Sequence, residues 1–330
     1  MINKIELTGF KSFVSDEIDF NQLTILSGLN SSGKSSVIQA VRLLEKVQQT
    51  NKVYLPGHGS IAESRNPYLK DNLVIKCTLT NNDYFEFNET GRTEVSSNFK
   101  LPDIIHIAAD RMGPESNIEI DPTGHKLGSR GENIFNVIEY YADYEIPSVV
   151  KHERSQGDTF LFNLESWLNI ISPNTEFKSY VERKSDSSYG TFNGHRAKNV
   201  GFGLSYALPV ITALLLGTLN PAESLVILEN PEAHLHPRGQ TEIARFICLC
   251  AKAGLQILVE THSDHLFDGI RLFAKDAQDD FYTRVLAYWF ELDNDRNTDV
   301  SIVKFDQHGR IDNWPQGMFD QFSINASKLL

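Results

Sequence analysis

The stretch GLNSSGKS, from Gly28 to Ser35, constrains this chain of 330 residues more than any other part of it. It matches the pattern G-x-x-x-x-G-K-[ST] at every fixed position. The apolar run LTIL precedes it, and apolar residues at helical spacing follow it from Val37 to Val47. The stretch therefore predicts a buried strand, a glycine-bent loop and a helix in direct succession.

The residue types of this loop suit the binding of a phosphate group. Gly28 and Gly33 allow sharp turns that point backbone N–H groups at phosphate oxygens, and the helix adds the positive end of its dipole. Lys34 can reach the β- and γ-phosphates of ATP, and the hydroxyl of Ser35 can bind Mg²⁺. A chance glycine- and serine-rich loop that caps a helix is the alternative. The predicted nucleotide-binding residues of the loop are Asn30, Ser31, Ser32, Gly33, Lys34, Ser35 and Ser36.

Composition limits the remaining function classes. The net charge of -12 argues against a surface that holds DNA mainly by neutralising phosphates. Residues 178–184 and 194–198 are local basic clusters, and charges that solvate a strand pair and a loop explain them simply. We find no apolar run of the roughly 18 residues that span a bilayer, no signal peptide and no CxxC pair. We therefore expect a cytoplasmic protein without a membrane partner.

Strands and helices alternate in the second half of the chain, which predicts a parallel sheet with helical crossovers. Hairpin-like pairs of strands occupy the middle. The predicted fold class is α/β, with a mainly parallel core sheet, antiparallel β-rich segments and a helical region. We divide the chain into an N-terminal part of the core (1–50), a β-rich and helical insertion (51–195) and a C-terminal part of the core (196–330).

The stretch LVILENPEAHLHP begins with four apolar residues that predict a buried strand ending at Glu229. A carboxylate at the carboxyl end of such a strand can bind the Mg²⁺ of a nucleotide. Glu232, His234 and His236 could instead form a metal site of their own. Pro231 interrupts the strand that would place these side chains on one face, and a fourth ligand is lacking. We favour the first interpretation.

These motifs together resemble a known family. GFKSF…LTILSGLNSSGKSSVIQAV is similar to the N-terminal half of an SMC- or RecF-like ABC-type ATPase head. LVILENPEAHLHP resembles its Walker B strand and D-loop, and ILVETHSDHL resembles its switch-histidine strand. With VGFGLSYALP and NWPQGMFDQ, the chain is similar to stand-alone bacterial ATPases related to the OLD family, some of which act in phage defence. The resemblance implies a P-loop NTPase fold, ATP and Mg²⁺, with Ser35 and Glu229 as metal ligands.

The resemblance also assigns a signature loop. GFGLS precedes a long apolar helix, so Gly203 and Ser205 match by position the loop that contacts the γ-phosphate held by another subunit. The sequence departs from LSGGQ. A glycine-rich helix entry, with Ser205 as an ordinary polar residue of the first turn, is the alternative.

The catalytic residues that the resemblance implies are Glu232, Asn230 and His262. ABC-type heads carry two consecutive acids, whereas here Asn230 follows Glu229. An amide positions water but is a poor proton acceptor, so we expect slow hydrolysis, with Glu232 as the polarising carboxylate and Asn230 assisting. Glu232 could instead be a structural loop residue. His262 would sense the γ-phosphate, or simply bond a neighbouring loop.

The sequence leaves the roles of two further features undecided. Arg111 follows an apolar strand and could be a sensor residue of the Q-loop type or an ordinary surface arginine. Residues 128–133 form a second glycine-rich turn that could approach a nucleotide or partner, although a plain helix start is simpler.

A signature loop acts on the nucleotide of another copy, so the resemblance implies an ATP-dependent homodimer or higher oligomer. The middle of the chain is too short for an SMC arm, and no nuclease motif follows residue 265. We therefore expect a switch for a separate effector protein. The two alternatives are a RecF-like DNA-binding repair ATPase and a nucleotide-binding scaffold with negligible turnover.

Overall fold

The structure, a computed structural model, describes residues 1–69 and 72–329. Contacts divide the chain into two compact units. Unit 1 comprises Met1–Asp103, Thr283–Phe305 and Ile311–Leu330, and unit 2 comprises Ile104–Tyr282 and Asp306–Arg310. This division differs from the sequence-based one, because the region 51–195 is shared between the units rather than forming a part of its own.

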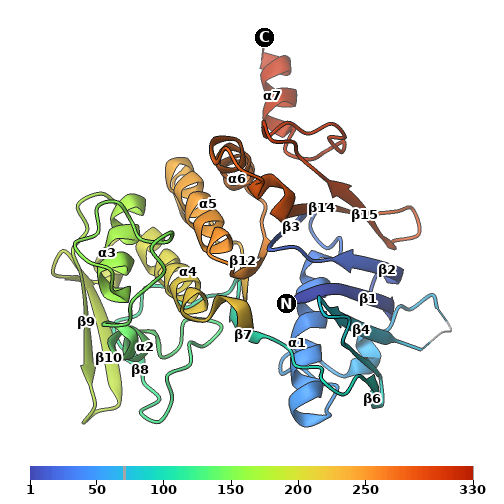
Figure 1. Ribbon diagram of the computed structural model, residues 1–330, viewed down its shortest axis with the longest axis horizontal. Coiled ribbons are helices and arrows are strands. Elements are labelled where there is room, and N and C mark those ends of the chain that lie inside the picture. Colours follow the sequence, from blue (N-terminus) through green and yellow to red (C-terminus); the bar gives the residue numbers. More distant parts are fainter. Residues whose placement is uncertain (70–71, 330) are drawn as a thin grey trace. The chain divides into compact units, whose positions relative to one another are not determined.

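Unit 1 combines an antiparallel sheet with the strand and helix around Gly28–Ser35 (Figure 1). Its elements are β1 (Ile2–Phe10), β2 (Phe13–Asp19), β3 (Leu23–Gly28), α1 (Lys34–Thr50), η1 (Ile61–Ser64), β4 (Val74–Leu79), β5 (Tyr84–Asn88), β6 (Gly91–Val95), β14 (Val285–Leu292), β15 (Thr298–Val303) and α7 (Gln321–Leu329).

The antiparallel sheet of unit 1 has the strand order β2-β1-β4-β5-β6. Alternate residues of β4 and β5 are buried, as the period of two in their sequences requires. Ile75 pairs with Phe87, and Cys77 pairs with Phe85, so one face of the sheet is apolar. Residues 73–80 and 84–88 therefore form the predicted hairpin.

A second strand group of unit 1 carries the phosphate-loop region. β3 is buried at every residue and pairs in parallel with β14, which pairs antiparallel with β15. The apolar stripe of α1 is buried, including Val37, Val41 and Leu44. The predicted succession of buried strand, bent loop and helix is present.

The helix α7 differs from the other helices of unit 1 because none of its described residues is buried. Phe322 is 78% exposed and Leu329 is 87% exposed.

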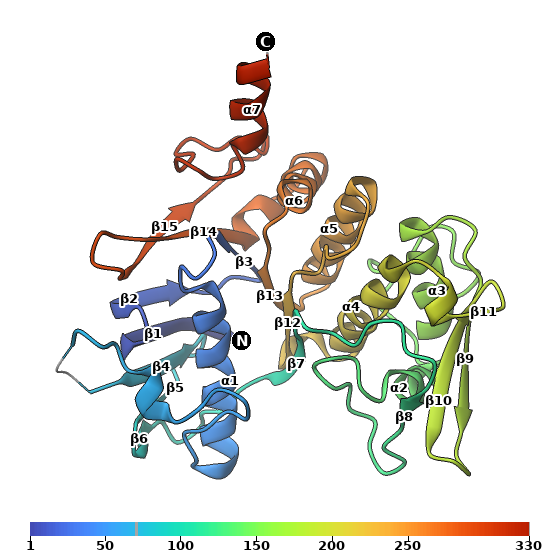
Figure 2. The same ribbon diagram turned by 180° about the vertical axis from the view of Figure 1, so that it is seen from behind.

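Unit 2 contains several helices that pack around a parallel strand pair, and a small antiparallel sheet (Figure 2). From its start, its elements are β7 (Asp103–Ile107), β8 (Ile118–Glu119), α2 (Ile134–Tyr141), α3 (Phe160–Ile171), β9 (Phe177–Glu182), β10 (Ser187–Phe192), β11 (His195–Arg196), η2 (Ala197–Asn199), α4 (Phe202–Leu219), η3 (Pro221–Glu223), β12 (Ser224–Glu229), α5 (Pro237–Lys252), β13 (Gln256–Glu260), α6 (Asp264–Asp276) and η4 (Phe281–Arg284).

The strands of unit 2 that matter for function follow the order β13-β12-β7. β12 and β13 pair in parallel, and Glu229 lies opposite Glu260 at their carboxyl ends. Gly217 lets α4 approach this layer, because a Cβ atom there would lie 2.7 Å from Val226. The alternation of strands and helices predicted for the second half of the chain is thus confirmed.

One prediction about the apolar segments needs correction. α4 is long and apolar enough to cross a membrane by length and composition, with a mean hydropathy of 1.8 over 18 residues. The long apolar helix expected after GFGLS is present; it begins at Phe202 and continues through Pro209, which gives it the length that the sequence analysis had not counted as one apolar run. Of this window, 67% is buried inside the protein, which is typical of a core helix.

Candidate functional site

The phosphate loop, Gly28–Ser35, is held by two glycines in conformations that other residues rarely adopt. Gly28 has a φ of 147°, and a Cβ atom there would lie 2.2 Å from the carbonyl oxygen of Phe290. Gly33 has a φ of 112°, and its Cβ atom would lie 2.6 Å from the hydroxyl of Thr298. Both positions therefore require glycine, for backbone conformation and for space.

Hydrogen bonds close the loop from inside. The Lys34 ammonium donates to the carbonyl oxygens of Gly28 and Leu29, at 3.1 and 2.6 Å. The Ser32 hydroxyl donates to Leu29, and the Thr298 hydroxyl donates to the carbonyl oxygen of Ser32. Lys34 is only 3% exposed. A buried ammonium held on backbone carbonyls can turn toward an incoming phosphate without leaving the loop.

The predicted loop residues divide into an exposed tip and a buried base. Asn30, Ser31 and Ser35 are exposed, whereas Ser32 and Ser36 are buried. The exposed hydroxyl of Ser35, at the start of α1, suits a ligand of Mg²⁺. The oxygen chemistry of this position therefore fits the metal that the motif predicts.

The acid turn of unit 2, Glu229–His236, begins where β12 ends. A hydrogen bond of 2.7 Å joins Oε1 of Glu229 to Nε2 of His106, on β7. The sequence analysis did not identify His106. Its place as a polar residue in the apolar strand DIIHI was the available signal.

Arg111 holds this turn by its backbone, so the interpretation of an ordinary surface arginine is wrong. Its guanidinium donates to the carbonyl oxygens of Ala108 (3.0 Å), Glu229 (2.7 Å) and Asn230 (2.7 Å). It also lies 5.5 Å from the ring centroid of Tyr206, on α4. Burial lowers the pKa of Arg111 to about 10, which leaves it charged at neutral pH.

Glu232 lies inside the turn and supports the strand end that carries His262. Its Oε1 atom accepts from the Thr261 hydroxyl at 2.8 Å and from the backbone N–H of His262 at 3.0 Å. The His262 side chain itself is exposed. Burial raises the pKa of Glu232 above its usual value, while these hydrogen bonds and the charge of Arg111 act in the opposite direction.

Three buried polar atoms of this region have no hydrogen-bond partner: Oδ1 of Asn230, Oε2 of Glu232 and Nε of Arg111. Asn230 has a φ of 45°, and its N–H donates to the carbonyl oxygen of Glu260. Buried polar atoms normally have partners, so this turn retains capacity to bind water or a ligand.

The alternative metal site at this turn is not formed. The ring of His234 lies 4.4 Å from the Tyr206 ring, and Nδ1 of His236 accepts the N–H of Arg238 at the start of α5. Glu232 bonds Thr261 and His262 instead. Across residues 1–69 and 72–329, no group of three or more His, Cys, Asp or Glu is placed to hold a metal ion.

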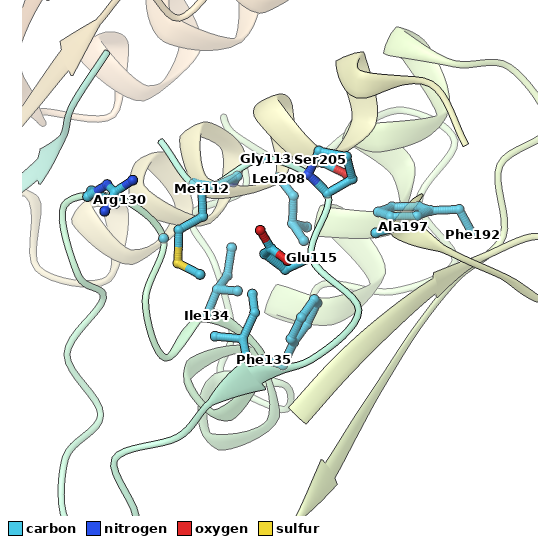
Figure 3. A pocket seen from close by; sticks show the side chains of 14 residues that line it. Met112, Gly113, Glu115, Arg130, Ile134, Phe135, Phe192, Ala197, Ser205 and Leu208 are labelled. Carbon is cyan, nitrogen blue, oxygen red and sulfur yellow. The ribbon is translucent and has the colours of Figure 1, made fainter. Parts of the chain in front are cut away.

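The signature-like residues lie at the first turn of α4. A Cβ atom at Gly203 would lie 3.0 Å from the carbonyl oxygen of His234, so this glycine permits contact with the acid turn. The Ser205 hydroxyl is buried and has no partner. It lines a cavity of about 30 Å³ together with Met112, Ile134, Phe135 and Leu208 (Figure 3). Ser205 is therefore directed inward in this structure.

The second glycine-rich turn, 128–133, supports the segment that carries Arg111. Ser129 and Arg130 accept the backbone N–H groups of Ala108 and Met112 at 2.8 and 2.7 Å. Gly131 has a φ of 91° and packs against Pro209 of α4. Asn133 precedes α2 without a side-chain cap. The turn thus has a structural role in unit 2.

The two basic clusters named in the sequence analysis lie on the β9–β10–β11 sheet and the turn after it. Lys178, Arg183 and Lys198 form ion pairs with Glu176, Glu139 and Glu115. Exposed pairs of this kind are typical of a solvated surface.

Comparison with protein families matches residues 23–268 to the family described as "AAA domain, putative AbiEii toxin, Type IV TA system". Residues 282–329 match a family described as "Protein of unknown function (DUF3696)". A comparison with curated proteins gave no match.

Two solved structures illustrate the fold. The SMC head bound to the C-winged helix domain of ScpA is 14% identical, with a TM-score of 0.56, and the match covers 93% of this chain and 98% of that one. The SMC head with an extended coiled coil, bound to the C-terminal domain of ScpA from Pyrococcus furiosus, is 13% identical, with a TM-score of 0.51 and 99% coverage of both chains. These likenesses show a P-loop NTPase fold of the ABC-type head, as the sequence predicts.

Proposed function

We propose that this chain, which belongs to the family of AAA domains described as putative AbiEii toxin, binds ATP with Mg²⁺, hydrolyses it slowly and works as a nucleotide-dependent switch. The family match runs from β3 through the phosphate loop, the acid turn and the switch-histidine segment. Nucleotide binding follows from this membership, while the slow turnover and the switch are our proposal.

The formed phosphate loop is the observation that carries the proposal. Gly28 and Gly33 adopt the positive-φ conformations that allow a phosphate-binding turn, and Lys34 is held by backbone carbonyl oxygens at the base of the loop. A chance glycine-rich helix start would need neither a buried lysine nor two sterically required glycines.

The resemblance supports Ser35 and Glu229 as ligands of Mg²⁺, because a hydroxyl and a carboxylate are oxygen ligands of the kind this ion prefers. When bound, the ion neutralises charge on the β- and γ-phosphates. Glu232 is the candidate proton acceptor, because its Oε2 atom is buried and unpaired and burial raises its pKa. Asn230 offers an amide oxygen that can orient water.

The way in which Glu232 is held supports our proposal of slow turnover. One of its oxygens is committed to Thr261 and to the backbone of His262, and Asn230 stands where the resemblance expects an acid. A long-lived ATP-bound state would suit a switch that holds a separate effector, and we extend the proposal to a role in defence against phage on the basis of the resemblance alone.

The switch requires a second copy of the chain. The first turn of α4 leaves Gly201 and Phe202 exposed, and backbone N–H groups at a helix start can contact an anion. We propose that Gly203 and Ser205 serve the nucleotide of a partner subunit, for which the Ser205 hydroxyl must turn out of its cavity.

The decisive experiment measures nucleotide binding by calorimetry and mass by light scattering, with and without ATP and Mg²⁺. We expect ATP to bind and to increase the mass, and Lys34→Ala to abolish both effects. Lys46→Ala, on the same helix but outside the loop, is the matched control. Absence of ATP binding by the unaltered protein would refute the proposed function, whereas binding without a change in mass would refute only the dimer.

A scaffold with negligible turnover remains the second candidate, because Asn230 and the engaged Glu232 both weaken the case for a general base. Phosphate release above background, lost in Lys34→Ala, excludes it.

A further inference from the structure

A polar groove in unit 2 lies outside the regions described above. It has a volume of about 300 Å³, at the lower end of the range for small-molecule sites. Three segments form it: the loop His152–Arg154, the C-terminal end of α3 with the following turn, and the first turns of α5. We call it the arginine groove after Arg154, Arg238 and Arg245, which line it.

Within the described residues, none of the three guanidinium groups lies within 4 Å of a carboxylate oxygen. This holds even though Glu153 and Glu242 also line the groove. In a protein with a net charge of -12, this is a local concentration of unpaired positive charge.

A buried aromatic residue fixes part of the groove. Trp167 is 2% exposed and donates its ring N–H to the carbonyl oxygen of Val150 at 3.2 Å. The guanidinium of Arg245 lies 5.8 Å from its ring centroid, and the ring of His152 meets it edge-on at 4.9 Å. Arg245 and His152 therefore both pack against the buried ring of Trp167.

His152 adds a neutral hydrogen-bond donor. It is a buried side chain whose Nδ1 atom accepts the backbone N–H of Arg154 at 3.0 Å, so Nε2 carries the proton in the neutral ring. Burial lowers the pKa of His152, and the charges of Arg245 and Arg154 act in the same direction against that of Glu153. The ring is therefore uncharged at neutral pH.

The start of α5 contributes to the same electrostatic character. Arg238 is the second residue of this helix of 16 residues, so the groove meets the positive end of its dipole. Arginine forks and helix starts both favour phosphate. The carboxylates of Glu153 and Glu242 would repel a polyanion but can accept hydrogen bonds from hydroxyl groups.

We propose that the arginine groove binds a small molecule that carries one phosphate group and several hydroxyl groups, of the size and chemistry of a sugar phosphate. The site is separate from the phosphate loop and does not depend on the proposed ATPase activity. The groove is connected to the acid turn through α5, because Arg238 lies two residues after His236. The same helix accepts a hydrogen bond at Gln240 from the hydroxyl of Ser263, at 2.6 Å. A phosphate bound by Arg238 would therefore lie at the start of the helix that follows the acid turn.

The test uses the full chain with the Lys34→Ala substitution, so that binding at the phosphate loop does not contribute. Ribose 5-phosphate, inorganic phosphate and a single-stranded DNA oligonucleotide are titrated by calorimetry. We expect ribose 5-phosphate to bind, inorganic phosphate to bind more weakly, and Arg154→Ala and Arg238→Ala each to weaken binding about tenfold. Arg183→Ala, which removes an exposed arginine of unit 2 outside the groove, should leave the affinity unchanged.

A second readout guards against variants that lose the fold. The imidazole proton signals of His152 in NMR spectra should shift when ribose 5-phosphate is added to the Lys34→Ala protein, and Arg245→Gln should reduce the shift. The proposal is overturned if neither small phosphate binds, if the arginine variants bind as well as their parent, or if only the oligonucleotide binds.

Discussion

The phosphate loop of unit 1 and the acid turn of unit 2 both follow buried strands, yet different forces shape them. In the phosphate loop, Lys34 and Ser32 donate hydrogen bonds to carbonyl oxygens of the same short segment, and one further bond comes from the distant Thr298. In the acid turn, the fixing contacts come from Arg111 and Thr261, far away in the sequence, and three buried polar atoms lack partners.

This difference means that the phosphate loop is a binding site that is already formed, whereas the acid turn is a candidate catalytic site that can still adjust. The phosphate loop is complete before a nucleotide arrives, so binding costs little reorganisation. The acid turn keeps unpaired buried atoms, each of which is costly unless water or ligand joins it. Changes in the first region should therefore abolish binding, and changes in the second should alter turnover while binding persists.

The largest effect should come from Gly28→Ala. The added Cβ atom would lie 2.2 Å from the carbonyl oxygen of Phe290 at a φ of 147°, so β3 and β14 must separate locally. We expect a loss of about 4 kcal/mol in the free energy of unfolding and no ATP binding. Urea unfolding and calorimetry measure the two quantities. Gly201→Ala has ordinary φ and open space around its Cβ atom, and it should change neither.

Arg111→Ala should come next. It removes three hydrogen bonds to backbone carbonyls and leaves those groups buried, which we expect to cost about 3 kcal/mol. Urea unfolding checks the loss. Arg111→Lys should recover only part of it, because an ammonium cannot reproduce the planar fork. Full recovery by lysine would show that charge alone, and not the three bonds, holds the turn.

Glu232→Gln tests chemistry with little change in shape. The amide oxygen can still accept from Thr261 and from the His262 N–H, but it cannot take a proton. If Glu232 activates water, single-turnover hydrolysis should fall about 100-fold while the affinity for ATP is kept. An unchanged rate would remove Glu232 from the mechanism and leave it a structural role. Asn230→Ala should lower the rate less.

The smallest effect concerns pH and the same residue. Because burial raises the pKa of Glu232 in the folded state, the folded protein binds the proton more tightly, and stability falls as pH rises from the unfolded pKa through the folded one. Glu232→Gln removes this cost. The melting temperature of the variant relative to the unaltered protein should therefore be higher at pH 8 than at pH 4. A difference that is independent of pH would contradict the assigned shift.

The sequence predicted those parts of the molecule that local patterns encode. The succession β3, loop and α1 follows from an apolar run, two glycines and a helical stripe within about 25 residues. The β4–β5 hairpin and the alternation of β12, α5, β13 and α6 were readable for the same reason. The match to an AAA-domain family confirms the expected type of fold.

The sequence could not predict contacts that join distant segments. His106 and Glu229 are 123 residues apart, and Arg111 and Asn230 are 119 apart. Nothing in the neighbourhood of Arg111 distinguishes a buried clamp from a surface charge, because burial depends on how α4 and β12 pack around it. The inward direction of Ser205 has the same origin. The roles assigned to Glu232, Asn230 and His262 stay predictions.

The exposed helix α7 has a thermodynamic consequence. Isolated helices shorter than about 12–15 residues are marginal in water, and the nine residues of α7 bury no side chain that would compensate. Its backbone amides should exchange with deuterium far faster than those of α1, and a protease should cleave there before it cleaves elsewhere. Any surface that covers Phe322 would slow both reactions. The exchange rate of this one segment therefore reports whether another molecule is bound to unit 1.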